Sequence, residues 1–200
     1  MHDSAADLET LQREVPPLLA ELEARARCDG LATIPQATAR LLSLLVHCMQ
    51  ANRILEIGTA YGYATLWMTL ALPPAGKIWT IEPDIERARI AREYFDRAGK
   101  GEQVEIINSP ALDILPRFPQ RNLDIVFVDA DAADYEAYLA QSIPLLKLSG
   151  LVLFNGLLSR GSDSQSEHAG RFARAFLNHP DLDATLIPLG NGTGIGARIR

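Results

Sequence analysis

The chain has 200 residues, of which 48% are hydrophobic and 22% charged, a composition that suits one globular α/β domain with a sizeable core. Its formal net charge of -6 offers no general attraction for polyanions, so we expect a small-molecule partner rather than nucleic acid. No apolar run reaches the ~18 residues of a membrane span, and the acidic N-terminus lacks a signal-peptide pattern. We therefore predict a cytoplasmic protein that does not associate with a membrane.

Residues 1–33 are predicted to form a helical cover, and residues 34–200 the main part of one compact domain. Apolar residues recur in the cover at helical spacing, but two prolines must bend or divide it. The residues concerned are Leu8, Leu11, Val15, Leu18 and Leu22, with Pro16 and Pro17 among them. A second helix is predicted over residues 37–50, with Leu41, Leu44, Leu45 and Cys48 facing inward. The two cysteines, Cys28 and Cys48, lack metal-type spacing and are expected to be reduced thiols.

Five short apolar runs, rich in β-branched residues, then alternate with helical segments. This alternation is typical of a parallel sheet with crossover helices. The runs are residues 54–57, 78–81, 104–107, 125–128 and 151–154. We predict an α/β fold with a seven-stranded, mostly parallel sheet and helices on both faces.

Two further helices and a hairpin complete the prediction. One helix carries Ala88, Ala91, Phe95 and Ala98 on one face and ends at Gly99, which serves as its C-terminal cap. The last helix begins at Asp163 or Ser164, and Ser164 and Glu167 have capping-box spacing. Residues 184–200 are expected to form an antiparallel hairpin around the turn 190–192.

A glycine-rich turn follows the first strand, in the segment EIGTAYGY at residues 56–63. Ligands of open α/β sheets bind at such strand ends. Gly58 would let the backbone turn tightly and a ligand approach, and Gly62 would let the next helix pack closely. The spacing differs from a dinucleotide fingerprint, and Glu56 favours the ammonium group of a cationic ligand over a pyrophosphate. A purely structural turn is the alternative.

Acidic residues end the second and fourth strands. Glu82 lies about twenty residues beyond the glycines, where a carboxylate can accept hydrogen bonds from both ribose hydroxyls of NAD or S-adenosylmethionine. Its alternative role is to complement a helix dipole. The turn 108–112 after the third strand is expected to hold an adenine edge. Asp129 and Asp131 place two mutually repelling carboxylates at the same edge of the sheet, which favours a functional role.

Several of these segments resemble the cation-dependent O-methyltransferase family that includes catechol and caffeoyl-coenzyme A O-methyltransferases. The segments are RILEIGTAYGY at 53–63, TIE at 80–82, SPAL at 109–112, DIVFVDAD at 124–131 and the terminal IPLGNGTGIG. The resemblance implies a Rossmann-like methyltransferase fold, S-adenosylmethionine as cofactor and a homodimer. It implies cofactor contacts from Ile34, Glu56, Gly58, Thr59, Ala64, Glu82, Ala111 and Asp129, to which we add Gly62 from the turn itself. Family members often carry Ser at the position of Ala64.

Two departures from the family pattern concern catalysis. In the family, the residue matching Asp129 joins an Asp-Asn pair after the fifth strand to hold a divalent cation, and we align that pair with Phe154-Asn155. The family's general-base lysine falls at Ala132. A hard cation prefers six or more oxygen ligands, so we expect its binding to be weak or lost and assign no metal ligands. Asp129, Asn155 and Asp131 are our candidate catalytic residues.

Methyl transfer chiefly requires alignment of the acceptor with an activated methyl group. A base is still useful, and the candidates are Asp131, Asp134, Tyr135, Tyr138 and His168, with Arg160 as a candidate contact for an anionic acceptor. We favour O-methylation of a small hydroxylated molecule. The alternatives are a cofactor-binding scaffold or partner subunit with little turnover, a nicotinamide-dependent oxidoreductase, and a tRNA-modifying methyltransferase.

Overall fold

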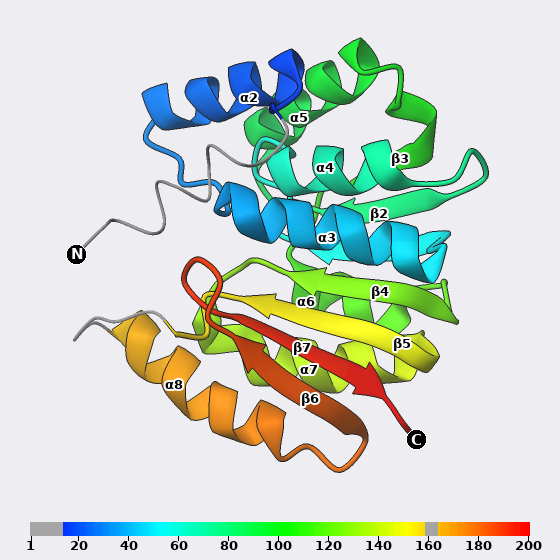
Figure 1. The fold of residues 1–200 in the computed structure, drawn as a ribbon, viewed down its shortest axis with the longest axis vertical. Helices are drawn as coiled ribbons and strands as arrows, with labels where there is room; N and C mark the ends of the chain where they lie inside the picture. The colour runs from blue at the N-terminus through cyan, green and yellow to red at the C-terminus, as the bar shows by residue number, and fades with distance from the viewer. Residues whose placement is uncertain (1–13, 159–163) are drawn as a thin grey trace.

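The computed structural model describes residues 14–158 and 164–200, and a seven-stranded sheet lies at its centre (Figure 1). The strand order is β3-β2-β1-β4-β5-β7-β6. The first five strands run parallel, whereas β7 is antiparallel to both β5 and β6. The predicted sheet with its terminal antiparallel hairpin is thus confirmed. The strands are β1 Arg53–Ile57, β2 Lys77–Ile81, β3 Val104–Ile107, β4 Leu123–Val128, β5 Leu146–Asn155, β6 Leu182–Ile187 and β7 Thr193–Arg198.

Helices cover both faces of the sheet, as predicted (Figure 1). Successive strand residues point to opposite faces, so Ile54 packs with α2 to α5 while Leu55 packs with α6 to α8. The parallel strands are buried on both faces, which explains why they were visible as continuous apolar runs. The helices are α2 Pro17–Cys28, α3 Gln36–Met49, α4 Tyr63–Ala71, α5 Ile85–Arg97, α6 Ala111–Ile114, α7 Tyr135–Ser142 and α8 Ser164–Leu177.

The buried face of α3 differs from the prediction. Leu44 is 57% exposed and Cys48 is also exposed, whereas Leu42 and Val46 are buried against α4 and the sheet. Apolar residues surround most of this helix, so periodicity alone could not identify its buried face. On α2, Leu22 lies in the same core as α3 to α5, so the described part of the predicted cover is packed onto the domain.

The ends of α5 follow the sequence signals. The Asp84 side chain accepts hydrogen bonds from the backbone N–H groups of the first turn, and Gly99 follows the helix with a φ of 66°. The predicted hairpin turn also forms, between β6 and β7. Predictions on Leu8, Leu11, Arg160 and Asp163, and on the side chain of Ser164, lie outside the described residues. Within the described residues, no helix combines the length and apolar character that a membrane crossing requires.

Candidate functional site

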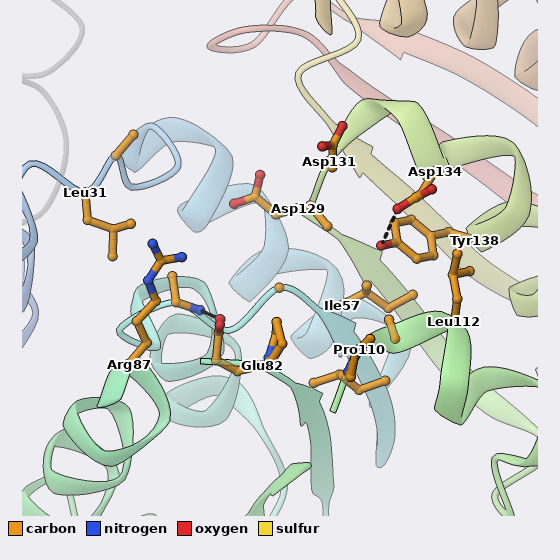
Figure 2. A pocket seen from close by; sticks show the side chains of 17 residues that line it. Leu31, Ile57, Glu82, Arg87, Pro110, Leu112, Asp129, Asp131, Asp134 and Tyr138 are labelled. Atoms are coloured by element: carbon orange, nitrogen blue, oxygen red, sulfur yellow. Dashed lines mark hydrogen bonds between the residues drawn. The ribbon is translucent and has the colours of Figure 1, made fainter. Parts of the chain in front are cut away.

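A cavity of about 480 Å³ opens at the carboxyl ends of β1, β2 and β4 (Figure 2). Ligands of parallel sheets bind at this edge, because the loops that follow the strands diverge there. A smaller hollow adjoins the cavity and shares Gly58 and Asp129 with it. Of the predicted site residues, the cavity is lined by Gly58, Glu82, Ala111, Asp129 and Asp131, and the hollow by Ile34, Gly58, Thr59, Ala64 and Asp129.

The two glycines of the turn have different roles. Gly58 has a φ of 100°, and a Cβ there would lie 2.1 Å from the carbonyl oxygen of Asp129. Only glycine therefore fits between β1 and the segment after β4. Gly62 has a φ of 85°, and a Cβ there would lie 2.5 Å from the ring of Phe95 on α5. Gly62 lines neither the cavity nor the hollow, so it serves helix packing rather than the cofactor contact that we predicted.

Glu82 is buried and lines the cavity (Figure 2), and backbone donors hold its carboxylate on both sides. Its Oε2 accepts a hydrogen bond from the Ala60 N–H at 2.7 Å, and its Oε1 accepts one from the Asp84 N–H at 3.0 Å. Each carboxylate oxygen can accept more than one hydrogen bond. The Glu82 carboxylate is therefore fixed in place and can still accept hydrogen bonds from a pair of ligand hydroxyls.

Glu56 lies where the sequence did not lead us to expect it. Its side chain is fully buried and lines neither the cavity nor the hollow. Its Oε2 accepts hydrogen bonds from the hydroxyls of Thr65 and Thr80, the latter at 2.6 Å. Burial raises the pKa of Glu56 to about 8, although the two threonines act in the opposite direction. The predicted direct contact with a ligand ammonium group is not supported by this placement.

Asp129 and Asn155 lie side by side where β4 and β5 end. The register pairs Val128 with Phe154, and Asn155 Nδ2 donates a hydrogen bond to Asp129 Oδ1 at 3.0 Å. Burial raises the pKa of Asp129, while the hydrogen bond from Asn155 lowers it. The predicted meeting of these two residues at the edge of the sheet therefore occurs in the structure.

Phe154 points away from this site, which corrects our alignment of the family's cation-binding pair. Its ring packs in the core below α7 and α8, with centroids 5.1 Å from Tyr135 and 4.6 Å from Phe172. Asn155 is the residue that lies beside Asp129, and Gly156 follows it in the chain.

The residues beside Asp129 do not fit a divalent cation. Asn155 donates an N–H to the carboxylate and leaves only its Oδ1 as a neutral oxygen, and glycine offers no side-chain oxygen at the next position. A hard cation favours several oxygen ligands, usually with more than one carboxylate. Within residues 14–158 and 164–200, no three His, Cys, Asp or Glu side chains form a group that could hold a metal ion.

The structure brings three of the candidate bases to the cavity. Asp131 accepts a hydrogen bond from the Ala133 N–H at 2.9 Å, and the Tyr138 hydroxyl donates one to Asp134 at 3.4 Å. Burial raises the pKa of Tyr138 to about 12, so this hydroxyl is a donor rather than a base at neutral pH.

The other two candidates lie elsewhere. Tyr135 is buried in the core, where its hydroxyl donates a hydrogen bond to the Asn155 carbonyl at 2.7 Å. His168 lines a separate hollow together with Glu136 and Arg171.

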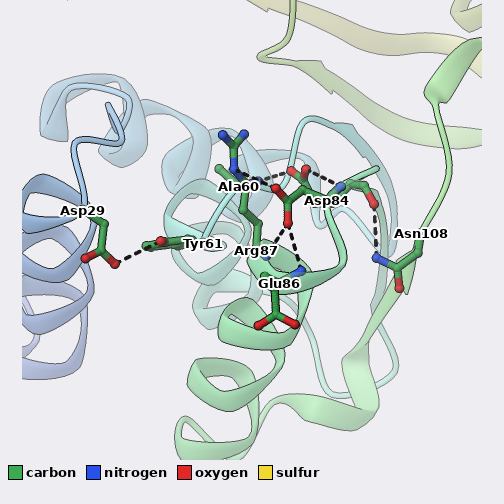
Figure 3. A network of polar contacts seen from close by, with 8 residues as sticks. Asp29, Ala60, Tyr61, Asp84, Glu86, Arg87 and Asn108 are labelled. Atoms are coloured by element: carbon green, nitrogen blue, oxygen red, sulfur yellow. Dashed lines mark hydrogen bonds and ion pairs between the residues drawn. The ribbon is translucent and has the colours of Figure 1, made fainter.

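Sequence reasoning missed several residues that line the cavity, among them Arg87, Leu31 and Ala32. Arg87 lies in the first turn of α5, five residues beyond Glu82. Because ligands bind at the carboxyl ends of parallel strands, its place shortly after β2 could have identified it. Leu31 and Ala32 lie between α2 and α3, and their position depends on tertiary packing that no local pattern reveals. The Tyr61 hydroxyl donates a hydrogen bond to Asp29 at 3.0 Å and so ties this connection to the glycine turn (Figure 3).

Comparisons with known proteins find similar sequences and similar folds. A family model described as O-methyltransferase matches residues 9–199. A catechol O-methyltransferase of Mycobacterium tuberculosis is 34% identical over 186 residues, which cover 89% of this chain and 84% of the relative. One from Niastella koreensis is 36% identical over 160 residues, with 75% and 72% covered. The O-methyltransferase TomG from Streptomyces achromogenes, solved in complex with S-adenosylmethionine, is 27% identical with a TM-score of 0.88 over 100% of both chains.

Proposed function

The chain belongs to the O-methyltransferase family, and from this premise we propose that it methylates a hydroxyl of a small catechol-like molecule with S-adenosylmethionine, without a divalent cation. The observation that carries this proposal is the cavity of about 480 Å³, in which Glu82 and Asp129 lie on either side of the Gly58 turn. Relatives named catechol O-methyltransferase support the choice of acceptor, and the TomG complex supports the cofactor.

The cofactor would be held by three groups of residues. Glu82 would accept hydrogen bonds from the ribose hydroxyls, because its carboxylate is fixed by two backbone donors and retains accepting capacity. Pro110 and Ala111 would contact the adenine from the turn after β3. The amino-acid end would lie against the smaller hollow beside Asp129, which is lined by Ile34, Gly58, Thr59 and Ala64. When bound, S-adenosylmethionine supplies a methyl group that its sulfonium has already activated.

The protein then has to align the acceptor oxygen and receive its proton. Alignment and exclusion of water can account for ~7–11 kcal/mol of a two-substrate barrier. Asp129 lies at the junction of the cavity and the hollow, and Asn155 fixes its Oδ1. We assign Asp129 Oδ2 as the atom that receives the hydroxyl proton while the new O–CH3 bond forms and the methyl–sulfur bond breaks. Burial raises the pKa of Asp129, which makes the carboxylate a stronger base than an exposed aspartate.

The test is a methylation assay with a panel of catechols, in EDTA and in Mg²⁺, with product detection by mass spectrometry. We expect equal rates in both buffers, and a loss of ~10²–10⁴-fold in Asp129→Asn if its carboxylate is the general base. Asp113→Asn, at an exposed carboxyl group of α6 outside the cavity, is the matched control. Activity that requires Mg²⁺ would refute the cation-free mechanism. Cofactor binding with no product from any acceptor would favour the scaffold alternative, and no cofactor binding would overturn the proposal.

We further propose, from the family resemblance, a homodimer that acts in the cytoplasm. Light scattering after size exclusion tests the first point, and a monomer at micromolar concentration would refute it.

A further inference from the structure

We propose that Glu56 is a positioning residue, which holds the cofactor-binding turn from behind through threonine hydroxyls and does not contact the cofactor. This inference rests on the proposed function, since it names how one residue serves the cofactor site. It departs from the direct contact with the cofactor's ammonium group that the family resemblance implies for this position.

Glu56 lies at a junction of three elements behind the site. It belongs to β1, and the two hydroxyls that converge on its Oε2 come from Thr65 of α4 and Thr80 of β2. Both threonines and Glu56 itself have 0% exposure. No part of the Glu56 side chain reaches the cavity or the hollow, so a bound molecule would meet the turn rather than this carboxyl group.

A chain of hydrogen bonds connects Glu56 to a residue that does reach the hollow. The Thr80 hydroxyl is 2.6 Å from Glu56 Oε2 and 2.6 Å from the hydroxyl of Thr59, which lines the hollow. A hydroxyl carries one hydrogen. Because Thr80 donates its hydrogen to Glu56, the contact between the two threonines must use the hydrogen of Thr59.

The donor-to-acceptor direction of these hydrogen bonds determines whether Thr59 presents a hydrogen or lone pairs to a ligand. With its hydrogen directed toward Thr80, Thr59 Oγ1 presents only lone pairs to the hollow, which suits an N–H donor such as an ammonium group. Thr65, on the other branch, ties Glu56 to the first turn of α4, next to Ala64 of the hollow. Glu56 thus fixes two walls of the hollow while remaining outside it.

The protonation of Glu56 agrees with an indirect role. Burial raises its pKa to about 8, with Asp129 and Glu82 adding in the same direction, so the neutral form predominates near pH 7. A neutral carboxyl group with its proton on Oε1 still accepts both threonine hydrogen bonds at Oε2, but it gives little attraction for a cation. Its Oε1 has no hydrogen-bond partner among the described residues.

The test compares Glu56→Gln with Glu56→Leu in calorimetric titrations of S-adenosylmethionine and in steady-state kinetics. Glutamine keeps an oxygen for both threonines and lacks the charge, so we expect an affinity within about threefold of the unchanged protein, less than a typical hydrogen bond contributes. Leucine removes the acceptor, and we expect binding at least about tenfold weaker, seen in the cofactor KM more than in kcat. Equal losses in both variants would show a direct charge contact and overturn the inference.

Two threonine variants keep the test decisive if the leucine variant does not fold. Thr80→Val removes the hydrogen bonds that connect Glu56 to Thr59, while Glu56 itself remains. It should weaken cofactor binding about as much as Glu56→Leu. Thr69→Val is the matched control, because Thr69 is an equally buried threonine of α4 whose hydroxyl donates to the Thr65 carbonyl and not to Glu56. An unchanged affinity in Thr80→Val would overturn the inference. Absence of cofactor binding in the unchanged protein would instead reject the proposed function, and this inference with it.

Discussion

The raised pKa of Glu56 predicts a specific dependence of stability on pH. Its ordinary value is 4.5, and burial raises the folded-state pKa to about 8. Between these two pH values the folded protein binds more protons than the unfolded chain, so the free energy of unfolding falls as pH rises. The loss begins near the unfolded value and is complete above the folded one. In Glu56→Gln, which cannot titrate, this loss should be absent.

The magnitude follows from the two pKa values. One pKa unit corresponds to ~1.4 kcal/mol, and partial titration at both ends of the range reduces the effect between pH 5 and pH 7 to about 2.5 kcal/mol. Urea unfolding at several pH values, followed by tryptophan fluorescence, measures the difference between the unchanged protein and Glu56→Gln. Glu86→Gln, which removes an exposed carboxyl group of α5, is the control. Parallel stability profiles for Glu56→Gln and the unchanged protein would refute the assignment of a buried, neutral carboxyl group.

Other substitutions test the site itself. Glu82→Gln should weaken S-adenosylmethionine binding at least about tenfold in calorimetry, because an amide cannot accept from both ribose hydroxyls and both backbone donors; an unchanged affinity would contradict its role. Gly58→Ala should abolish cofactor binding, since its Cβ would lie 2.1 Å from a carbonyl oxygen, and retained binding would show that the turn can shift. Asn155→Asp should raise Mg²⁺ affinity by placing a second carboxylate beside Asp129, a gain that calorimetry would detect. Phe154→Asp should leave the Mg²⁺ affinity unchanged and lower the free energy of unfolding by roughly 3–5 kcal/mol, because it buries a carboxyl group in an aromatic cluster. Equal gains in Mg²⁺ affinity in Asn155→Asp and Phe154→Asp would contradict the strand register.

The sheet and the position of the site could be predicted because they depend on short-range patterns. The run 104–107 coincides with β3, since a strand buried on both faces is continuously apolar. The sequence alone could assign Gly58, Glu82 and Asp129 to one site, because the carboxyl ends of parallel strands lie at one edge of the sheet.

Three of the errors concern the direction in which a side chain points. Neighbouring residues in a strand face opposite sides, so an alignment error of one position exchanges Phe154 in the core for Asn155 in the site. Glu56 has the sequence context of a ligand contact, but its face of β1 lies under α4. On α3, the packing partners rather than the periodicity decide that Leu44 is exposed. The direction of each of these side chains depends on tertiary contacts, which a single sequence does not reveal.

The insertion of β7 between β5 and β6 has a consequence for folding during synthesis. β7 is made after β6, yet β6 reaches the sheet only through it. Until residues 193–198 emerge from the ribosome, β5 keeps an open edge and the nascent chain is exposed to pairing with other chains. The residues that line the main cavity all precede β5, so a cofactor could dock on the growing chain before its sheet is complete.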